Sequence, residues 1–199
     1  MTRSLWTTIG LGCAALALAG CATTTAASQT PARPAGSSAP SAAPSQAAVT
    51  SPSDTAKMVC GPQIQGSVKQ ALSLTTLTAP KPTWRDSLYS CVYQLPAGPM
   101  TLSVKQSASD AAATSYFSKL RPSFGKTQTM IGLGTASYGT GDGIVVVVKD
   151  DKTLVVDTTK LPKVFGNQGQ KRGDLAYEIA SDVLGCWTGN DYGSTVAPG

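Results

Sequence analysis

One stretch of the sequence, residues 22–56, offers almost nothing that a folded core could use. Of its 35 residues, 30 are Ala, Ser, Thr, Pro or Gly, and none is aromatic, Leu or Ile. Such a segment cannot offset the entropy of ordering its backbone by burying apolar surface, so we expect it to be disordered. A flexible chain of this length has an r.m.s. reach of roughly 30–35 Å. The sequence therefore predicts a tether followed by one folded domain over residues 57–199.

The first 20 residues have the parts of an export signal. Arg3 supplies a positive charge, an apolar stretch runs from Leu5 to Ala19, and small residues precede a cysteine. Residues 18–21, Leu-Ala-Gly-Cys, resemble the lipobox of bacterial lipoproteins. In that motif the cysteine, here Cys21, receives a diacylglycerol and fatty acids such as palmitate and becomes the first residue of the mature chain. The alternative is an ordinary secretory signal that happens to precede a cysteine.

Lipidation at Cys21 anchors a protein without spanning the bilayer. The apolar stretch before Cys21 is too short for a comfortable transmembrane span, and the longest aliphatic run after it, Ile144–Val148, has only five residues. We therefore expect a lipid-anchored protein on the extracytoplasmic side of the cell membrane. The substitution Cys21→Ser is expected to release it from the membrane.

Three segments of the domain have helical periodicity. The first covers residues 61–73. The second begins at Ser109 or Asp110, either of which can cap a helix, and ends before Pro122. The third begins at Asp174.

Short strands lie between these helices. Alternating apolar residues predict strands over Leu88–Leu95 and over 100–105, joined as a hairpin by Pro96–Pro99. The continuous apolar runs Ile144–Val148 and Leu154–Val156 predict two strands that are covered on both faces and joined by a tight turn. Together, these elements predict an α+β domain in which about three helices are layered on an antiparallel sheet.

Three cysteines remain once Cys21 is lipidated, so at most one intramolecular disulfide forms. Disulfides persist outside the cytoplasm, and we favour Cys60–Cys91 because it ties the first helix to the first strand across a proline-rich segment. Cys60–Cys186 is the alternative. Cys186, beside Trp187, is interpreted either as a buried small side chain or as a reactive or intermolecular thiol.

These features together resemble a group of small actinobacterial lipoproteins that carry a domain of unknown function. The resemblance rests on the lipobox, the tether, a cysteine that opens the first helix, a cysteine in the first strand, and the Gly-Leu-Gly-x-Ala sequence at 132–136. It implies an exported single α+β domain and brings no established activity.

The charge distribution points to one segment. Residues 57–199 contain 14 basic and 10 acidic residues, and Thr158–Gly173 supplies the whole excess through Lys160, Lys163, Lys171 and Arg172, with no acid. Lys171 and Arg172 lie just before a predicted helix amino terminus, where the helix dipole disfavours positive charge. We interpret the segment either as a contact for an anionic surface or as a soluble loop.

Several kinds of chemistry are excluded or weakly supported. The chain has no histidine, which removes imidazole bases and imidazole metal ligands. The glycines at 132–143 lead into a strand rather than a helix, so we interpret them as turn glycines and not as a phosphate loop. Asp150 and Asp151 lack a calcium-binding loop around them. The remaining acid and base candidates are Asp142, Asp157 and Asp174 with Lys152 or Lys160, and their spacing favours none of them.

The sequence thus favours a non-enzymatic envelope lipoprotein that binds a partner protein or an envelope component, without a metal, cofactor or nucleic acid. One alternative is a carrier of a small apolar ligand or lipid, with pocket walls drawn from the aromatic residues Tyr89, Tyr93, Tyr116 and Phe117. The other is a hydrolase or transferase whose site only three-dimensional proximity would reveal. The basic segment is the candidate contact of the favoured hypothesis, and neutralising its four charges is expected to leave folding intact.

Overall fold

The computed structural model describes residues 49–165 and 169–193. The predicted export signal, Cys21 and the tether up to residue 48 lie outside the described residues. In chain order the elements are α1 (Asp54–Lys57), η1 (Met58–Cys60), α2 (Pro62–Ala71), β1 (Lys81–Arg85), β2 (Leu88–Leu95), β3 (Gly98–Gln106), α3 (Asp110–Leu120), η2 (Arg121–Phe124), β4 (Gln128–Thr129), β5 (Ala136–Gly139), β6 (Ile144–Lys149), β7 (Lys152–Asp157), β8 (Val164–Phe165), β9 (Gln170–Lys171) and α4 (Arg172–Gly193).

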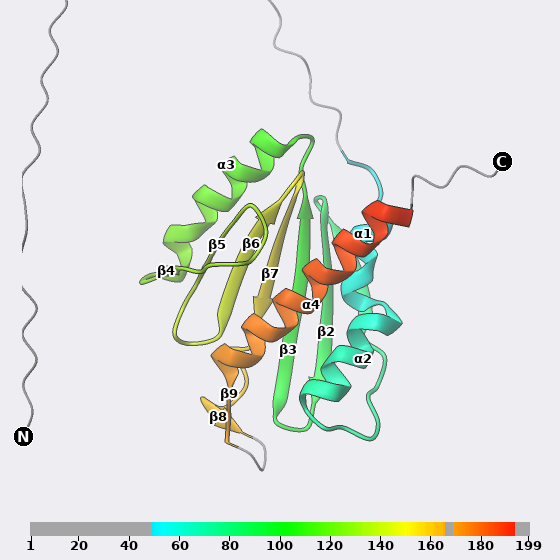
Figure 1. The fold of residues 1–199 in the computed structure, drawn as a ribbon, viewed down its shortest axis with the longest axis vertical. Coiled ribbons are helices and arrows are strands. Elements are labelled where there is room, and N and C mark those ends of the chain that lie inside the picture. The colour runs from blue at the N-terminus through cyan, green and yellow to red at the C-terminus, as the bar shows by residue number, and fades with distance from the viewer. Residues whose placement is uncertain (1–48, 166–168, 194–199) are drawn as a thin grey trace, which may run out of the picture. The chain divides into compact units, whose positions relative to one another are not determined.

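Seven strands form one antiparallel sheet in the order β1–β2–β3–β7–β6–β5–β4 (Figure 1). Strands β8 and β9 form a separate small hairpin. Helices α2 and α4 pack on one face of the sheet, and α3 packs on β6 and β7 from the other face. This arrangement confirms the predicted α+β class, with an antiparallel sheet and three main helices.

Burial along the strands explains the layering. In β2 every second residue from Tyr89 to Leu95 is buried against the α2 and α4 side, as the alternation predicts. Strand β6 is buried on both faces: Val145 and Val147 belong to the larger core, and Ile144 and Val146 belong to the smaller core under α3. The continuous apolar run of β6 therefore reflects a strand covered on both sides, as expected.

Strands β1, β4 and β5 of the sheet were not predicted. No strand was predicted between the first helix and Leu88, yet β1 covers Lys81–Arg85 and contains Pro82. A proline is tolerated there because β1 is the edge strand of the sheet. The glycine-rich run 132–143 was expected to form turns, and it also contributes β5, in which Tyr138 is fully buried.

The domain begins before the predicted boundary at Lys57. Ser53 caps α1 by accepting a hydrogen bond from the Ala56 amide, and Ala56 is fully buried. The Ser53 amide donates to Gln106 Oε1 at 2.7 Å, and Trp187 Nε1 donates to the Thr55 carbonyl at 3.1 Å. Residues 49–56, which the composition assigns to the tether, are thus part of the domain because these long-range contacts offset the entropy of ordering them.

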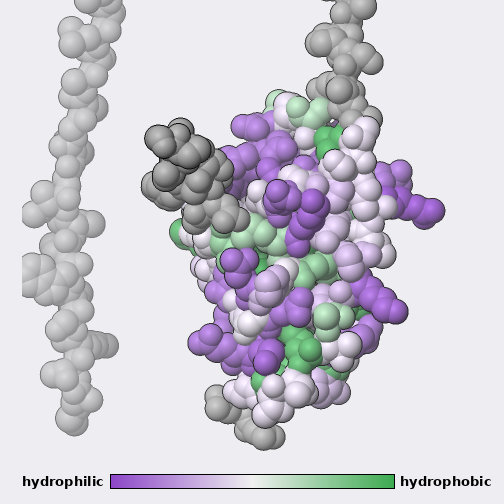
Figure 2. Space-filling view, turned by 90° about the vertical axis from the view of Figure 1, so that its right-hand side faces the viewer, coloured by the Kyte–Doolittle hydropathy of each residue, from purple (hydrophilic) through white to green (hydrophobic). Residues whose placement is uncertain are grey.

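The surface of the domain is mixed in character. On the side that Figure 2 shows, hydrophilic residues separate smaller apolar patches. Within residues 49–165 and 169–193, no helix is long and apolar enough to cross a membrane.

Candidate functional site

The basic segment is organised around Arg172, the first residue of α4. Arg172 Nη1 donates to the carbonyl oxygens of Thr159 at 2.9 Å and Leu161 at 2.8 Å, and Nη2 lies 3.1 Å from Asp142 Oδ1. The side chain is only 14% exposed. Arg172 is therefore a structural residue that holds the segment, and the expectation that its charge contacts a partner and is dispensable for folding does not fit this burial.

Thr158 links the β5–β6 turn to the start of α4. Its hydroxyl is buried and lies 2.8 Å from the carbonyl oxygens of both Gly143 and Arg172, so it can donate to either. Gly143 has φ +95°, and a Cβ there would collide with Thr158 Oγ1. Only glycine fits at this point, which confirms the interpretation of Gly143 as a turn glycine.

The three lysines of the segment project from this framework. Lys160, Lys163 and Lys171 are all exposed. Lys163 is 81% exposed, and its Nζ lies 3.8 Å from Asp142 Oδ1. The carbonyl of Lys160 packs against Gly98, at the β2–β3 turn. The structure thus separates the four predicted contact residues into one half-buried arginine and three exposed lysines.

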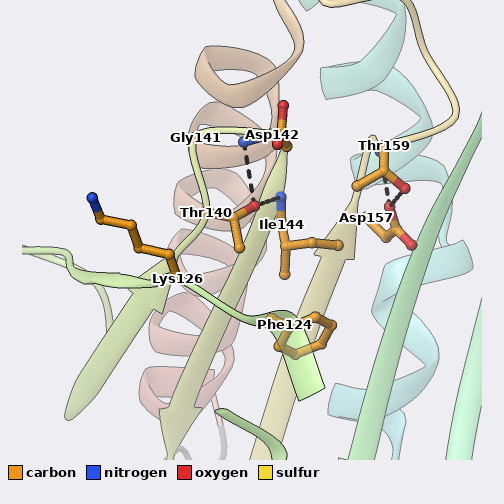
Figure 3. Close-up of a pocket in the computed structure, with 8 residues that line it drawn as sticks. All are labelled: Phe124, Lys126, Thr140, Gly141, Asp142, Ile144, Asp157 and Thr159. Carbon is orange, nitrogen blue, oxygen red and sulfur yellow. Dashed lines mark hydrogen bonds between the residues drawn. The ribbon is translucent and has the colours of Figure 1, made fainter. Parts of the chain in front are cut away.

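A pocket of about 570 Å³ lies beside this framework, on the α3 side of the sheet (Figure 3). It is lined by residues from η2, from the loop after it, from the β5–β6 turn and from the ends of β6 and β7: Phe124, Lys126, Thr140, Gly141, Asp142, Ile144, Asp157 and Thr159. Asp142 also contacts Arg172 and Lys163, so it joins the pocket to the basic segment.

The polar groups of the pocket are held by local hydrogen bonds. Thr140 Oγ1 accepts from the amides of Asp142 at 3.3 Å and Ile144 at 3.2 Å. Asp157 Oδ1 accepts from the amide of Thr159 at 2.8 Å and from its hydroxyl at 2.6 Å. The walls of the pocket are therefore preorganised before any ligand arrives.

Of the acid candidates, the structure brings Asp142 and Asp157 to this pocket, and Asp174 does not line it. Phe124, Lys126, Thr140 and Thr159 were not predicted as site residues. A local signal was Phe124, an aromatic residue two positions beyond Pro122, just after the predicted end of the second helix.

The aromatic residues that were considered as walls of a carrier pocket do not line one cavity. Tyr89 and Tyr93 belong to the core under α2 and α4, whereas Phe117 belongs to the core under α3. Tyr93 is fully buried, its hydroxyl donates to the Val59 carbonyl at 2.6 Å, and burial raises its pKa. Lys105 Nζ lies 5.8 Å from the centre of the Tyr116 ring. These side chains stabilise the fold.

The cysteines follow the favoured prediction. Cys60 and Cys91 form a disulfide with their Cα atoms 5.7 Å apart, so the Cys60–Cys186 pairing is wrong. Cys186 is free and half-buried. Burial, together with the nearby Asp182 carboxylate, raises the pKa of its thiol. A raised pKa disfavours the thiolate, which is the reactive form.

The β6–β7 turn contains two ion pairs between neighbouring residues. Asp150 lies 2.7 Å from Lys149 Nζ, and Asp151 pairs with Lys152. Asp150 has a positive φ of 52°, which is common for aspartate in tight turns. Within the described ranges, no three His, Cys, Asp or Glu side chains gather as a metal-binding group.

Comparison of the chain with known protein families, with curated proteins and with solved structures finds no match.

Proposed function

We propose that the chain is a lipid-anchored, extracytoplasmic binding protein without catalytic activity, and that its exposed lysines contact an anionic component of the cell envelope. The anchor rests on the export signal and the lipobox cysteine, Cys21, and the resemblance to small actinobacterial lipoproteins points the same way. The observation that carries the binding role is the placement of Lys160, Lys163 and Lys171 on a framework fixed by Arg172. Because the backbone that carries these charges is already ordered, binding a partner loses less conformational entropy than it would for a flexible loop.

The position of the lysines supports this role. The described chain enters the domain near the start of β2, where the Ser87 hydroxyl donates to the Val49 carbonyl. Lys160 lies at the other end of β2, against Gly98. Eight strand residues separate the two ends, about 25 Å. Figure 1 shows the same arrangement, with β8 and β9 at the end of the domain away from α1. The lysines therefore lie at the end of the domain opposite the point where the described residues begin.

The test compares two triple variants in the chain that carries Cys21→Ser, which keeps the protein soluble for the assay. The test variant is Lys160→Gln, Lys163→Gln and Lys171→Gln, and the control is Lys69→Gln, Lys81→Gln and Lys119→Gln. The net charge falls by three in both. Binding to washed cell envelopes of the producing organism is measured by co-sedimentation over a range of salt concentrations.

A lysine near an anionic surface contributes on the order of 1 kcal/mol, so removing three is expected to weaken binding about 100-fold. The affinity of the control variant for the envelopes is expected to lie within about threefold of that of the parent chain. Added salt is expected to weaken the binding of the parent chain to the envelopes. Equal loss in both triple variants would show that net charge alone drives binding. Unchanged binding in the test variant would remove the basic segment from the contact.

A further inference from the structure

We propose that the pocket beside the basic segment binds one pyranose ring of an envelope glycan, whose anionic groups then reach the lysines. This inference rests on the proposed function and names its ligand class. The volume of about 570 Å³ lies within the about 300–1,000 Å³ of small-molecule sites. Sites of this kind combine an apolar floor with a few placed polar groups, and the following features provide both.

The apolar part of the pocket is Phe124 with Ile144. The Phe124 ring is half-buried and packs at 6.4 Å from the Tyr138 ring, centre to centre, which fixes its orientation. Figure 3 shows the ring beneath the polar residues that line the pocket. An aromatic ring attracts C–H groups to its face because that face is electron-rich. The C–H face of a sugar ring fits this surface.

The polar part of the pocket offers mainly hydrogen-bond acceptors. Asp157 uses Oδ1 for Thr159, and Asp142 uses Oδ1 for Arg172 and Lys163. Among the described residues, the second oxygen of each carboxylate has no hydrogen-bond partner. Hydroxyl groups of a ligand can donate to these oxygens, and such charge-assisted hydrogen bonds are stronger than neutral ones.

The local charge argues against a cationic ligand. Asp142 is ion-paired with Arg172 and Lys163. The exposed Lys126 also lines the pocket, and Figure 3 shows its ammonium group directed away from both carboxylates. Because Asp142 is already paired, a neutral sugar ring matches the pocket better than an amine or a metal ion does. Since Asp142 contacts both the pocket and Lys163, a glycan seated on Phe124 continues directly toward the lysines.

The test uses amide chemical shifts in the Cys21→Ser chain, titrated with galactotriose, trigalacturonate and N-acetylglucosamine trimer to 10 mM. The variants are Phe124→Leu, which keeps an apolar side chain without the ring, and Asp157→Asn, which can still accept from Thr159. The controls are Tyr116→Leu on α3 and Asp182→Asn on α4. Unchanged spectra outside the pocket establish that each variant is folded.

We expect at least one sugar to shift the amides of Gly141, Asp142 and Thr159. Phe124→Leu and Asp157→Asn are each expected to lower the affinity for that sugar about tenfold. The control variants are expected to bind it with an affinity within about twofold of the parent chain. The triple variant at Lys160, Lys163 and Lys171 is expected to bind trigalacturonate more weakly than the parent chain does. Its binding of galactotriose is expected to be unchanged.

Two results overturn the inference. The first is that no sugar shifts these amides at 10 mM. The second is that a sugar binds to both Phe124→Leu and Asp157→Asn as tightly as it binds to the parent Cys21→Ser chain. Neither result bears on the proposed function, which the envelope-binding assay tests on its own. The proposed function stands if the triple lysine variant loses envelope binding, and it is refuted if that variant keeps it.

Discussion

Replacing Arg172 tests the framework on which the lysines stand. Arg172→Gln removes two hydrogen bonds to the carbonyls of Thr159 and Leu161 and one ion pair with Asp142. Hydrogen bonds from a charged donor contribute about 1.5–3 kcal/mol each, and we take the lower value for each, which gives about 3 kcal/mol. Asp142 is 66% exposed, so the ion pair adds at most about 1 kcal/mol. We expect a loss of about 3–4 kcal/mol in the free energy of unfolding.

The assay is urea unfolding followed by tryptophan fluorescence, because Trp187 is buried and reports on the folded core. For a domain of this size the same loss lowers the melting temperature by about 6–16 °C. Arg172→Lys is expected to lose most of the same contribution to stability, since one ammonium group cannot replace the forked guanidinium. The control Lys171→Gln is exposed and is expected to stay within about 0.5 kcal/mol. A loss below about 1 kcal/mol in Arg172→Gln would refute the structural role of Arg172.

Two further predictions concern the core. Replacing Cys60 and Cys91 by Ser is expected to lower stability by up to about 3.7 kcal/mol, the chain-entropy value for a loop of this length, and equal urea midpoints for the two chains would contradict it. Burial raises the pKa of Tyr138 to about 12 from an ordinary value of 10, so its contribution to stability is complete below pH 10 and is lost as the pH rises toward 12. Absorbance titration at alkaline pH should therefore show a smaller late-titrating tyrosine signal in Tyr138→Phe, and an unchanged signal would contradict the assignment.

Local patterns were sufficient for much of the fold. The alternation in Leu88–Leu95 predicted β2 with the bounds that the structure has. Ser109, expected as a possible cap, accepts a hydrogen bond from the Ala112 amide at the start of α3. Both signals act within a few residues of the chain, and so sequence reasoning detects them.

The misplaced domain boundary has a long-range cause. Residues 49–56 have the composition of a tether, yet Trp187 donates to Thr55 from 132 residues away. Composition measures only what a segment can bury by itself. It does not register a segment that is held by partners elsewhere in the chain.

The same reason separates Arg172 from the lysines. Its position beside a helix amino terminus, unfavourable for a cation, suggested a contact with a partner. Its actual partners are the carbonyls of Thr159 and Leu161 and the carboxylate of Asp142, which lies 30 residues upstream. Likewise, Asp142 and Asp157 were among several equivalent acid candidates until the β5–β6 turn and the end of β7 placed them at one pocket.

The most direct test of the central claim is hydrogen–deuterium exchange of the Cys21→Ser chain with and without soluble anionic polysaccharide from its own envelope. We expect protection concentrated in residues 158–165 and 169–172 and around Asp142, all at the end of the domain that carries the lysines. Protection on the exposed side of β1 and β2 with none in these residues would contradict it, as would identical exchange in the presence and absence of the polysaccharide.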